Sequence, residues 1–234
     1  MFDLYISPSD QRSNTYAAGN TNEEAQCERI AAAVESAAKR CGINAFANLK
    51  DDMYTKVADA NKRGTLLYLC IHTNGFNKKV SGTRIFCHSF AGEGYKAAVC
   101  VFDELAPVTP GTSENIKENP ELYEIRMTYA PCVYVEVDFH DVDEVALWII
   151  AHTEEIAEAI VKGLCKYFGK VYVPVYAAEL PDGGDVVPRA EYEALLEKYV
   201  ALQTELTAVR TSADVLCARV EEAVKIFRTG NGNE

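Results

Sequence analysis

Apolar runs with the length of β-strands alternate with amphipathic helical stretches through the first 169 residues of the 234-residue chain. The strand-like runs cover residues 2–7, 43–49, 65–72 and 132–139. The helical stretches cover residues 23–42, 53–63, 93–106 and 143–169. Because such alternation is typical of a sheet packed between helices, the pattern predicts an α/β fold with a mixed, mostly parallel sheet and helices on both faces.

Residues that begin and end helices support this division. Asn22 is the predicted N-cap of the first helix and Gly42 its stop, and Gly169 closes the predicted helix over 143–169. Residues 107–131 are polar and contain prolines, so we predict a loop there.

The composition changes after Gly169, where three prolines and a Gly-Gly pair predict an extended linker with little packing of its own. We therefore divide the chain into an α/β domain over 1–170, a linker over 171–190, a coiled-coil helix over 191–228 and a disordered tail over 229–234.

The predicted C-terminal helix carries an apolar stripe with alternating spacings of three and four residues. Its members are residues 192, 195, 199, 202, 206, 209, 213, 216, 220, 223 and 227. A single helix cannot bury this stripe by itself, so it pairs with a second copy or folds back on the domain. We favour a homo-oligomer through residues 192–227, because a helix rising about 1.5 Å per residue would be roughly 50 Å long, more than the domain can easily cover.

The charge and the N-terminus limit the partners and the place of synthesis. A formal net charge of -12 argues against a nucleic-acid binder, which needs clustered Lys and Arg. The opening residues "MFDLYISPSDQRS" lack the pattern of a signal peptide, and we find no run long enough to span a membrane. We therefore expect a protein that is cytoplasmic when synthesised.

Ionisable side chains lie where α/β sheets hold their sites, at the carboxyl ends of strands or at the start of the next helix. Glu23 opens the first helix, His72 closes a buried strand, Glu136 is near the end of the last strand, and His140 follows it. Two histidines with a glutamate are the ligands of a catalytic Zn²⁺ site, and a further glutamate can act as its general base. Dispersed ligands alone make this a weak signal.

Several segments together resemble the zinc-dependent N-acetylmuramoyl-L-alanine amidases of the third amidase family, of the phage endolysin or sporulation type. In chain order they are "SPSDQRSNTYAAGNTNEEAQCERIA", "CIHTN", "SGTRIF", "APVTPGTSENI", "ELYEIRMTYAPCVYVEVDFHD" and "WIIAHTEEIAEAIVKGLCKYFG". The resemblance covers residues 1–169. It implies Zn²⁺, with Glu23 and His72 as ligands and Glu136 as the catalytic residue; Glu24 is the alternative to Glu23.

One part of the family pattern is missing. Many members carry Gly-His-Gly after the first strand, and its histidine is the remaining zinc ligand, whereas this chain reads "SPSDQ" there. We expect His140 to supply that ligand, with Asp10 or Gln11 as the alternative and an absent metal as the third possibility.

The remaining candidates concern the substrate. Gln11, Asn74 and Arg126 are the expected substrate-binding residues, although a turn role for Asn74 and surface ion pairing for Arg126 are the ordinary alternatives. The resemblance implies hydrolysis of the amide between N-acetylmuramic acid and L-alanine in peptidoglycan, after release of the protein to the cell wall. The alternatives are a zinc amidohydrolase acting on another wall bond and a non-catalytic wall-binding or scaffold module.

Overall fold

The computed structural model describes residues 2–175 and, further along, residues 194, 198, 201, 202, 205, 209, 212, 216, 219 and 220. Its contacts divide the chain into two compact units, Met1–Val175 and Tyr176–Glu234. The first unit contains the strands and helices of the predicted α/β domain. Their bounds are β1 (Phe2–Pro8), α1 (Glu23–Arg40), β2 (Ala45–Ala47), α2 (Met53–Arg63), β3 (Thr65–Asn74), β4 (Arg84–Cys87), α3 (Glu93–Leu105), β5 (Asn115–Glu118), α4 (Tyr123–Met127), β6 (Cys132–Phe139), α5 (Asp143–Ala151) and α6 (Thr153–Phe168).

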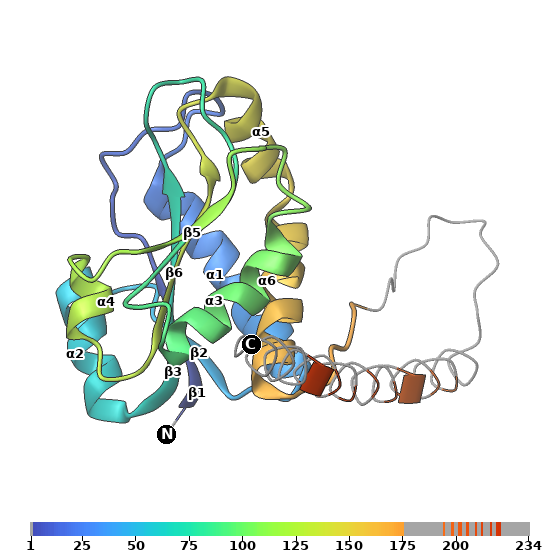
Figure 1. Cartoon of the computed structure of the whole chain (residues 1–234). Helices are drawn as coiled ribbons and strands as arrows, with labels where there is room; N and C mark the ends of the chain where they lie inside the picture. Colours follow the sequence, from blue (N-terminus) through green and yellow to red (C-terminus); the bar gives the residue numbers. More distant parts are fainter. Residues whose placement is uncertain are drawn as a thin grey trace, which may run out of the picture. The chain divides into compact units, whose positions relative to one another are not determined.

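The strands form a six-stranded sheet in the order β2-β1-β3-β6-β4-β5. Pairs β1–β2, β1–β3, β3–β6 and β4–β5 are parallel, and only β4–β6 among the described pairs is antiparallel. Helices cover both faces, with α2 and α4 on one side and α1, α3 and α6 on the other (Figure 1). The predicted fold class is therefore confirmed.

Each face of the sheet has its own apolar core, because successive strand residues point to opposite faces. Leu67, Leu69 and Ile71 of β3 belong to the larger core, on the side of α1, α3 and α6. Tyr68 and Cys70 of the same strand belong to the smaller core, on the side of α2 and α4. His72, two residues beyond Cys70, points to the same face as Tyr68 and Cys70 and lies nearer the carboxyl end of the strand.

The ends of α1 and α6 follow the predicted signals. The Asn22 side chain accepts a hydrogen bond from the backbone N–H of Ala25 at 2.9 Å, which makes it the N-cap of α1. Gly42, with φ at 73°, follows the C-cap of α1, and Gly169, with φ at 63°, is the C-cap of α6. These caps fix where α1 begins, and therefore where its first carboxylates lie.

Two predicted stretches differ from the structure. The helix expected over 143–169 is divided at His152, whose Nδ1 lies 2.7 Å from the backbone oxygen of Trp148 while its backbone leaves the helical region. The loop expected over 107–131 contains β5 and α4. Elements of four and five residues are too short to show a period in the sequence, which is why the pattern did not reveal them.

The first residues of the predicted linker are packed against the domain. Tyr172 is buried and donates a hydrogen bond to Glu158, and the backbone oxygen of Val173 accepts one from Arg40 at 2.8 Å. The prediction of a linker with little packing is therefore wrong for residues 171–175. An aromatic side chain and paired backbone groups hold this stretch despite Pro174.

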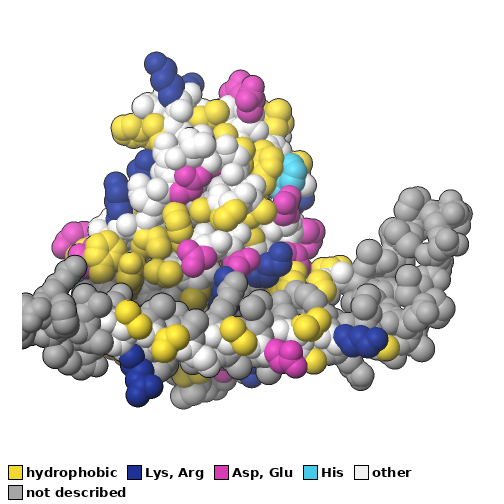
Figure 2. Space-filling view, turned by 45° about the vertical axis from the view of Figure 1, so that its right-hand side comes forward, with side chains coloured by type: hydrophobic (Ala, Val, Ile, Leu, Met, Phe, Trp, Pro, Cys, Tyr) yellow, Lys and Arg dark blue, Asp and Glu magenta, His cyan; other side chains and the backbone are white. Residues whose placement is uncertain are grey.

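Most of the predicted coiled coil and the whole predicted tail lie outside the described residues. The described residues between 194 and 220 are helical and exposed, and their coloured side chains stand out among grey atoms in Figure 2. Leu202, Val209 and Leu216, which are seven residues apart, are 64%, 64% and 63% exposed. Oligomerisation through this segment stays a prediction. Within the described part of the chain, we find no helix with the length and hydropathy of a membrane span.

Candidate active site

Three ionisable side chains form a row across neighbouring strands on one face of the sheet. In the β3–β6 pairing His72 is opposite Glu136, and in the β4–β6 pairing Arg84 is opposite Glu136. Side chains directly opposite each other have Cβ atoms about 5 Å apart. The regular pairing of β3 with β6 shifts just beyond His72, so the row lies where the paired strands end.

The N-terminus of α1 places Glu23 beside His72, near the carboxyl end of β3. Glu23 Oε1 accepts a hydrogen bond from His72 Nδ1 at 2.9 Å, and the two residues are 1% and 4% exposed. Glu24 instead forms a bidentate ion pair with Arg12, with distances of 2.6 and 3.0 Å. Of the two candidates in the sequence, Glu23 is therefore the one that meets His72.

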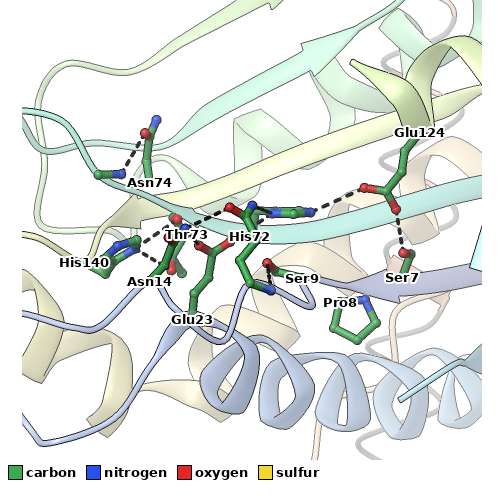
Figure 3. A network of polar contacts seen from close by, with 12 residues as sticks. Ser7, Pro8, Ser9, Asn14, Glu23, His72, Thr73, Asn74, Glu124 and His140 are labelled. Carbon is green, nitrogen blue, oxygen red and sulfur yellow. Dashed lines mark hydrogen bonds and ion pairs between the residues drawn. The ribbon is translucent and has the colours of Figure 1, made fainter. Parts of the chain in front are cut away.

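A third carboxylate, not expected from the sequence, approaches the other side of the imidazole. Glu124 of α4 is 2% exposed, and its Oε2 lies 3.4 Å from His72 Nε2. Its Oε1 accepts hydrogen bonds from the hydroxyls of Ser7 at 2.6 Å and Tyr68 at 2.9 Å. Figure 3 shows His72 between Glu23 and Glu124. Both ring nitrogens of His72 thus face carboxylate oxygens.

The charges of this group depend on one another. Burial disfavours the imidazolium, but Glu124 and Glu23 outweigh it and raise the pKa of His72 to about 10. Burial also opposes ionisation of Glu23 and Glu124, yet their contacts with His72 hold the pKa of each below its ordinary value. At neutral pH the three side chains therefore form a buried carboxylate–imidazolium–carboxylate arrangement.

Glu136 has a different environment from the other two glutamates. Its Oε2 is buried and has no hydrogen-bond partner among the described residues. Burial, together with the charge of Glu23, raises the pKa of Glu136 to about 7, although the positive charges of His72 and Arg84 oppose the rise. A carboxyl group of this kind can accept and return a proton near neutral pH.

The "SPSDQ" segment places Gln11, and not Asp10, beside His72. Gln11 Nε2 lies 3.4 Å from His72 Nδ1, and Gln11 Oε1 accepts a hydrogen bond from Asn14 at 2.9 Å. The Asp10 carboxylate accepts a hydrogen bond from the backbone N–H of Met53, at the start of α2. Gln11 therefore stands at the position where the family pattern led us to look for a third ligand.

His140 does not join this group. Its Nδ1 contacts the hydroxyl and the backbone oxygen of Thr73 at 2.9 and 3.0 Å, and its ring stacks on Tyr16. Of the other histidines, His88 is exposed and His152 stacks on Trp148. Within the described ranges, no three His, Cys, Asp or Glu side chains are arranged to hold a metal ion. Among the described residues the expected set of Glu23, His72 and His140 is thus not assembled, and His140 contacts Thr73 instead.

The two remaining candidates, Asn74 and Arg126, make a turn contact and a surface ion pair. The Asn74 side chain accepts a hydrogen bond from the backbone N–H of Gly75 at 2.8 Å, as a turn asparagine does. Arg126 is exposed and lies 3.7 Å from Glu121. Their binding of substrate stays a prediction.

The sequence contains one signal that points to Glu124. Glu124 stands between Tyr123 and Ile125 in "LYEIRM", and a carboxylate within an apolar stretch needs a partner if the stretch is buried. The pairing itself joins residues 52 positions apart, and only the packing of α4 over β3 brings them together.

The comparison with protein families decides which group the chain belongs to. The family profile described as N-acetylmuramoyl-L-alanine amidase matches residues 8–166. The chain belongs to this family. The match includes Gln11, Glu23, His72, Glu124 and Glu136, so the whole candidate site lies within the amidase domain.

Individual relatives are more distant. The amidase domain is similar in structure to the catalytic domain of the N-acetylmuramoyl-L-alanine amidase CwlV from Bacillus (Paenibacillus) polymyxa var. colistinus, with a TM-score of 0.64, 18% identity, and coverage of 72% of this chain and 99% of that chain. The amidase AmiC2 of Nostoc punctiforme gives a TM-score of 0.64, 19% identity, and coverage of 71% and 96%. An uncharacterized protein of Clostridium perfringens is 31% identical over 100 residues, which span 42% of this chain and only 30% of that relative. At these identities the structural matches show the fold.

The zinc ion implied by the family does not fit the side chains as arranged here. Catalytic zinc takes three protein ligands and leaves one position open. Glu23 and His72 are two of the expected ligands, but they are hydrogen-bonded to each other. Beside them lies an amide, Gln11, instead of an imidazole.

Proposed function

We propose that this amidase-family chain hydrolyses the amide bond between N-acetylmuramic acid and L-alanine in peptidoglycan, with Glu136 as the catalytic residue. The observation that carries the proposal is the position of Glu136 in β6, beside His72 and Arg84 and within the segment that matches the family. Action on the cell wall after release from the cytoplasm belongs to the same proposal.

The side chains of the row suggest how the reaction proceeds. Glu136 takes a proton from the water that attacks the amide carbon, and it returns that proton to the leaving amine. As the water adds, negative charge develops on the carbonyl oxygen, and Arg84, opposite Glu136 in the β4–β6 pairing, is the flanking cation that stabilises it until the amine leaves. The resemblance also implies a zinc-activated water, but because only two expected ligands meet, we assign no step to the ion.

The bond that is cleaved distinguishes this proposal from its alternatives. Digestion of purified peptidoglycan with the full chain should yield glycan strands free of peptide and peptides with a new L-alanine amino terminus. Mass spectrometry of the products identifies both. New ends at another amide or at an acetyl group would instead identify a different amidohydrolase.

The activity should depend on the protonation of Glu136. Because burial raises the pKa of Glu136 to about 7, the basic carboxylate is scarce in acid and becomes abundant as the pH passes through neutrality. We expect kcat/KM to rise with pH and to reach half its maximum near pH 7 rather than near 4.5, the ordinary value. Initial rates on a soluble muropeptide test this, and a constant rate between about pH 5 and pH 8 would contradict the role of Glu136 as base.

A second candidate function is favoured by the missing third ligand. A chain that keeps the amidase fold without turnover would be a wall-binding or scaffold module. Sedimentation of the chain with insoluble peptidoglycan, without release of new amino termini, would support this candidate.

We also propose that residues 192–227 join chains into oligomers. Exposed Leu202, Val209 and Leu216 support the proposal through their seven-residue spacing. Several catalytic domains on one assembly would bind a polymeric substrate with greater avidity.

A further inference from the structure

We infer that polar contacts among side chains take the place of the family's zinc ion in this chain, with Gln11 at the position of the missing ligand. The network consists of Gln11, Asn14, Glu23, His72 and Glu124. The inference deepens the proposed function, on which its catalytic meaning rests.

The two expected zinc ligands, Glu23 and His72, are closer together than an ion between them would allow. A tetrahedral zinc ion about 2 Å from a nitrogen and an oxygen would hold them roughly 3.3 Å apart. His72 Nδ1 and Glu23 Oε1 are 2.9 Å apart, the length of a hydrogen bond. His72 and Glu23 are therefore hydrogen-bonded to each other, with no ion needed between them.

The second carboxylate oxygen of Glu23 and the amide oxygen of Gln11 also have hydrogen-bond partners. Asn14 Nδ2 donates hydrogen bonds to Glu23 Oε2 at 2.7 Å and to Gln11 Oε1 at 2.9 Å. The Gln11 amide nitrogen, not its oxygen, lies beside His72. A metal ion would have to displace Asn14 from both oxygens and rotate the Gln11 amide.

A carboxylate also lies on the other side of the His72 imidazole. A histidine that binds zinc uses one nitrogen for the ion and commonly gives its other N–H to a carboxylate. Glu124 occupies that second position here, while Glu23 occupies the first. Both ring nitrogens of His72 thus have a carboxylate oxygen within 3.4 Å, and neither faces open space that an ion could fill.

The consequence is a site in which side chains of the chain itself occupy the place of the ion. If the chain hydrolyses peptidoglycan, Arg84 is the cation that stabilises the developing negative charge, and a chelator does not stop the reaction.

The test measures bound zinc and chelator sensitivity on the full-length chain. The wild-type chain and Gln11→His are produced with added zinc and dialysed into metal-free buffer, and zinc per chain is determined by elemental mass spectrometry. Circular dichroism confirms that both are folded. We expect less than about 0.1 zinc per wild-type chain and about 1 per Gln11→His chain, since the new imidazole completes a three-ligand set. Wild-type activity, where present, should survive EDTA.

Several results would overturn the inference. One is about one zinc per wild-type chain with imidazole ligation in its X-ray absorption spectrum. Loss of wild-type activity in EDTA, restored by zinc, is another. A Gln11→His chain that stays metal-free would remove Gln11 from the ligand position. Failure of the proposed function looks different, because a zinc-free chain that releases no new amino termini refutes hydrolysis and leaves the inference intact.

Discussion

Replacing Glu136 by glutamine is expected to lower the rate of amide hydrolysis by about 10²- to 10⁴-fold, the usual contribution of a general acid–base residue. Glutamine has nearly the same shape as glutamate but cannot accept the proton of the attacking water. The loss should appear in kcat. It should not weaken the fold, because Glu136 Oε2 has no hydrogen-bond partner within the described residues and its ionisation is opposed by burial.

The measurement compares initial rates and unfolding midpoints of the wild-type chain and Glu136→Gln. Glu144→Gln is the matched control, since Glu144 is an exposed carboxylate in the first turn of α5, a few residues beyond the same strand. The control should retain full activity. If Glu136→Gln released new amino termini at the wild-type rate, the assignment of Glu136 would fail.

The second large effect is on stability, through Glu124. Replacing Glu124 by glutamine should cost on the order of 3–5 kcal/mol, because His72 Nε2 loses its carboxylate and two buried hydroxyls lose a charged acceptor, while Glu23 still pairs with His72 Nδ1. Glu124 is 2% exposed and accepts from Ser7 and Tyr68 besides pairing with His72. The NH₂ group of the glutamine amide would face either the hydroxyl donors of Ser7 and Tyr68 or Nε2 of His72.

Urea unfolding at neutral pH gives the free energy of unfolding. Glu121→Gln is the control, because Glu121 lies just before α4, is exposed and pairs with Arg126 only at 3.7 Å. An exposed pair of this kind contributes about 0–1 kcal/mol. Equal stabilities of Glu124→Gln and Glu121→Gln would refute the buried pair.

The free energy of unfolding of the wild-type chain and that of Glu124→Gln differ by an amount that depends on pH. This dependence identifies His72 as the partner of Glu124. The pKa of His72 is raised from 6.5 to about 10 in the folded chain. The stabilisation by Glu124 is therefore fully present below about pH 6.5 and is lost as the pH rises toward 10. The difference in free energy of unfolding between the wild-type chain and Glu124→Gln should become smaller over that interval, whereas a merely steric defect would leave this difference unchanged.

The sequence by itself determined the fold class and the central strands. Strand β6 spans the predicted residues, and the caps at Asn22 and Gly169 are where the pattern placed them, because strand alternation and cap chemistry are local properties. The segments that resemble the third amidase family pointed to the family whose profile matches the chain. They also led to Glu23, His72 and Glu136, which do come together at one edge of the sheet.

Only the tertiary structure decided the partners of those residues. Glu23 or Glu24, and Asp10 or Gln11, are adjacent in sequence, and the choice within each pair depends on which side chain the backbone directs toward His72. His140 is close to Glu136 in sequence, yet a bulge and the hydrogen bonds to Thr73 direct it elsewhere. Glu124 entered the site because a five-residue helix packs over β3 and β6. Such a contact has no local period, so it is set by the packing of distant segments alone.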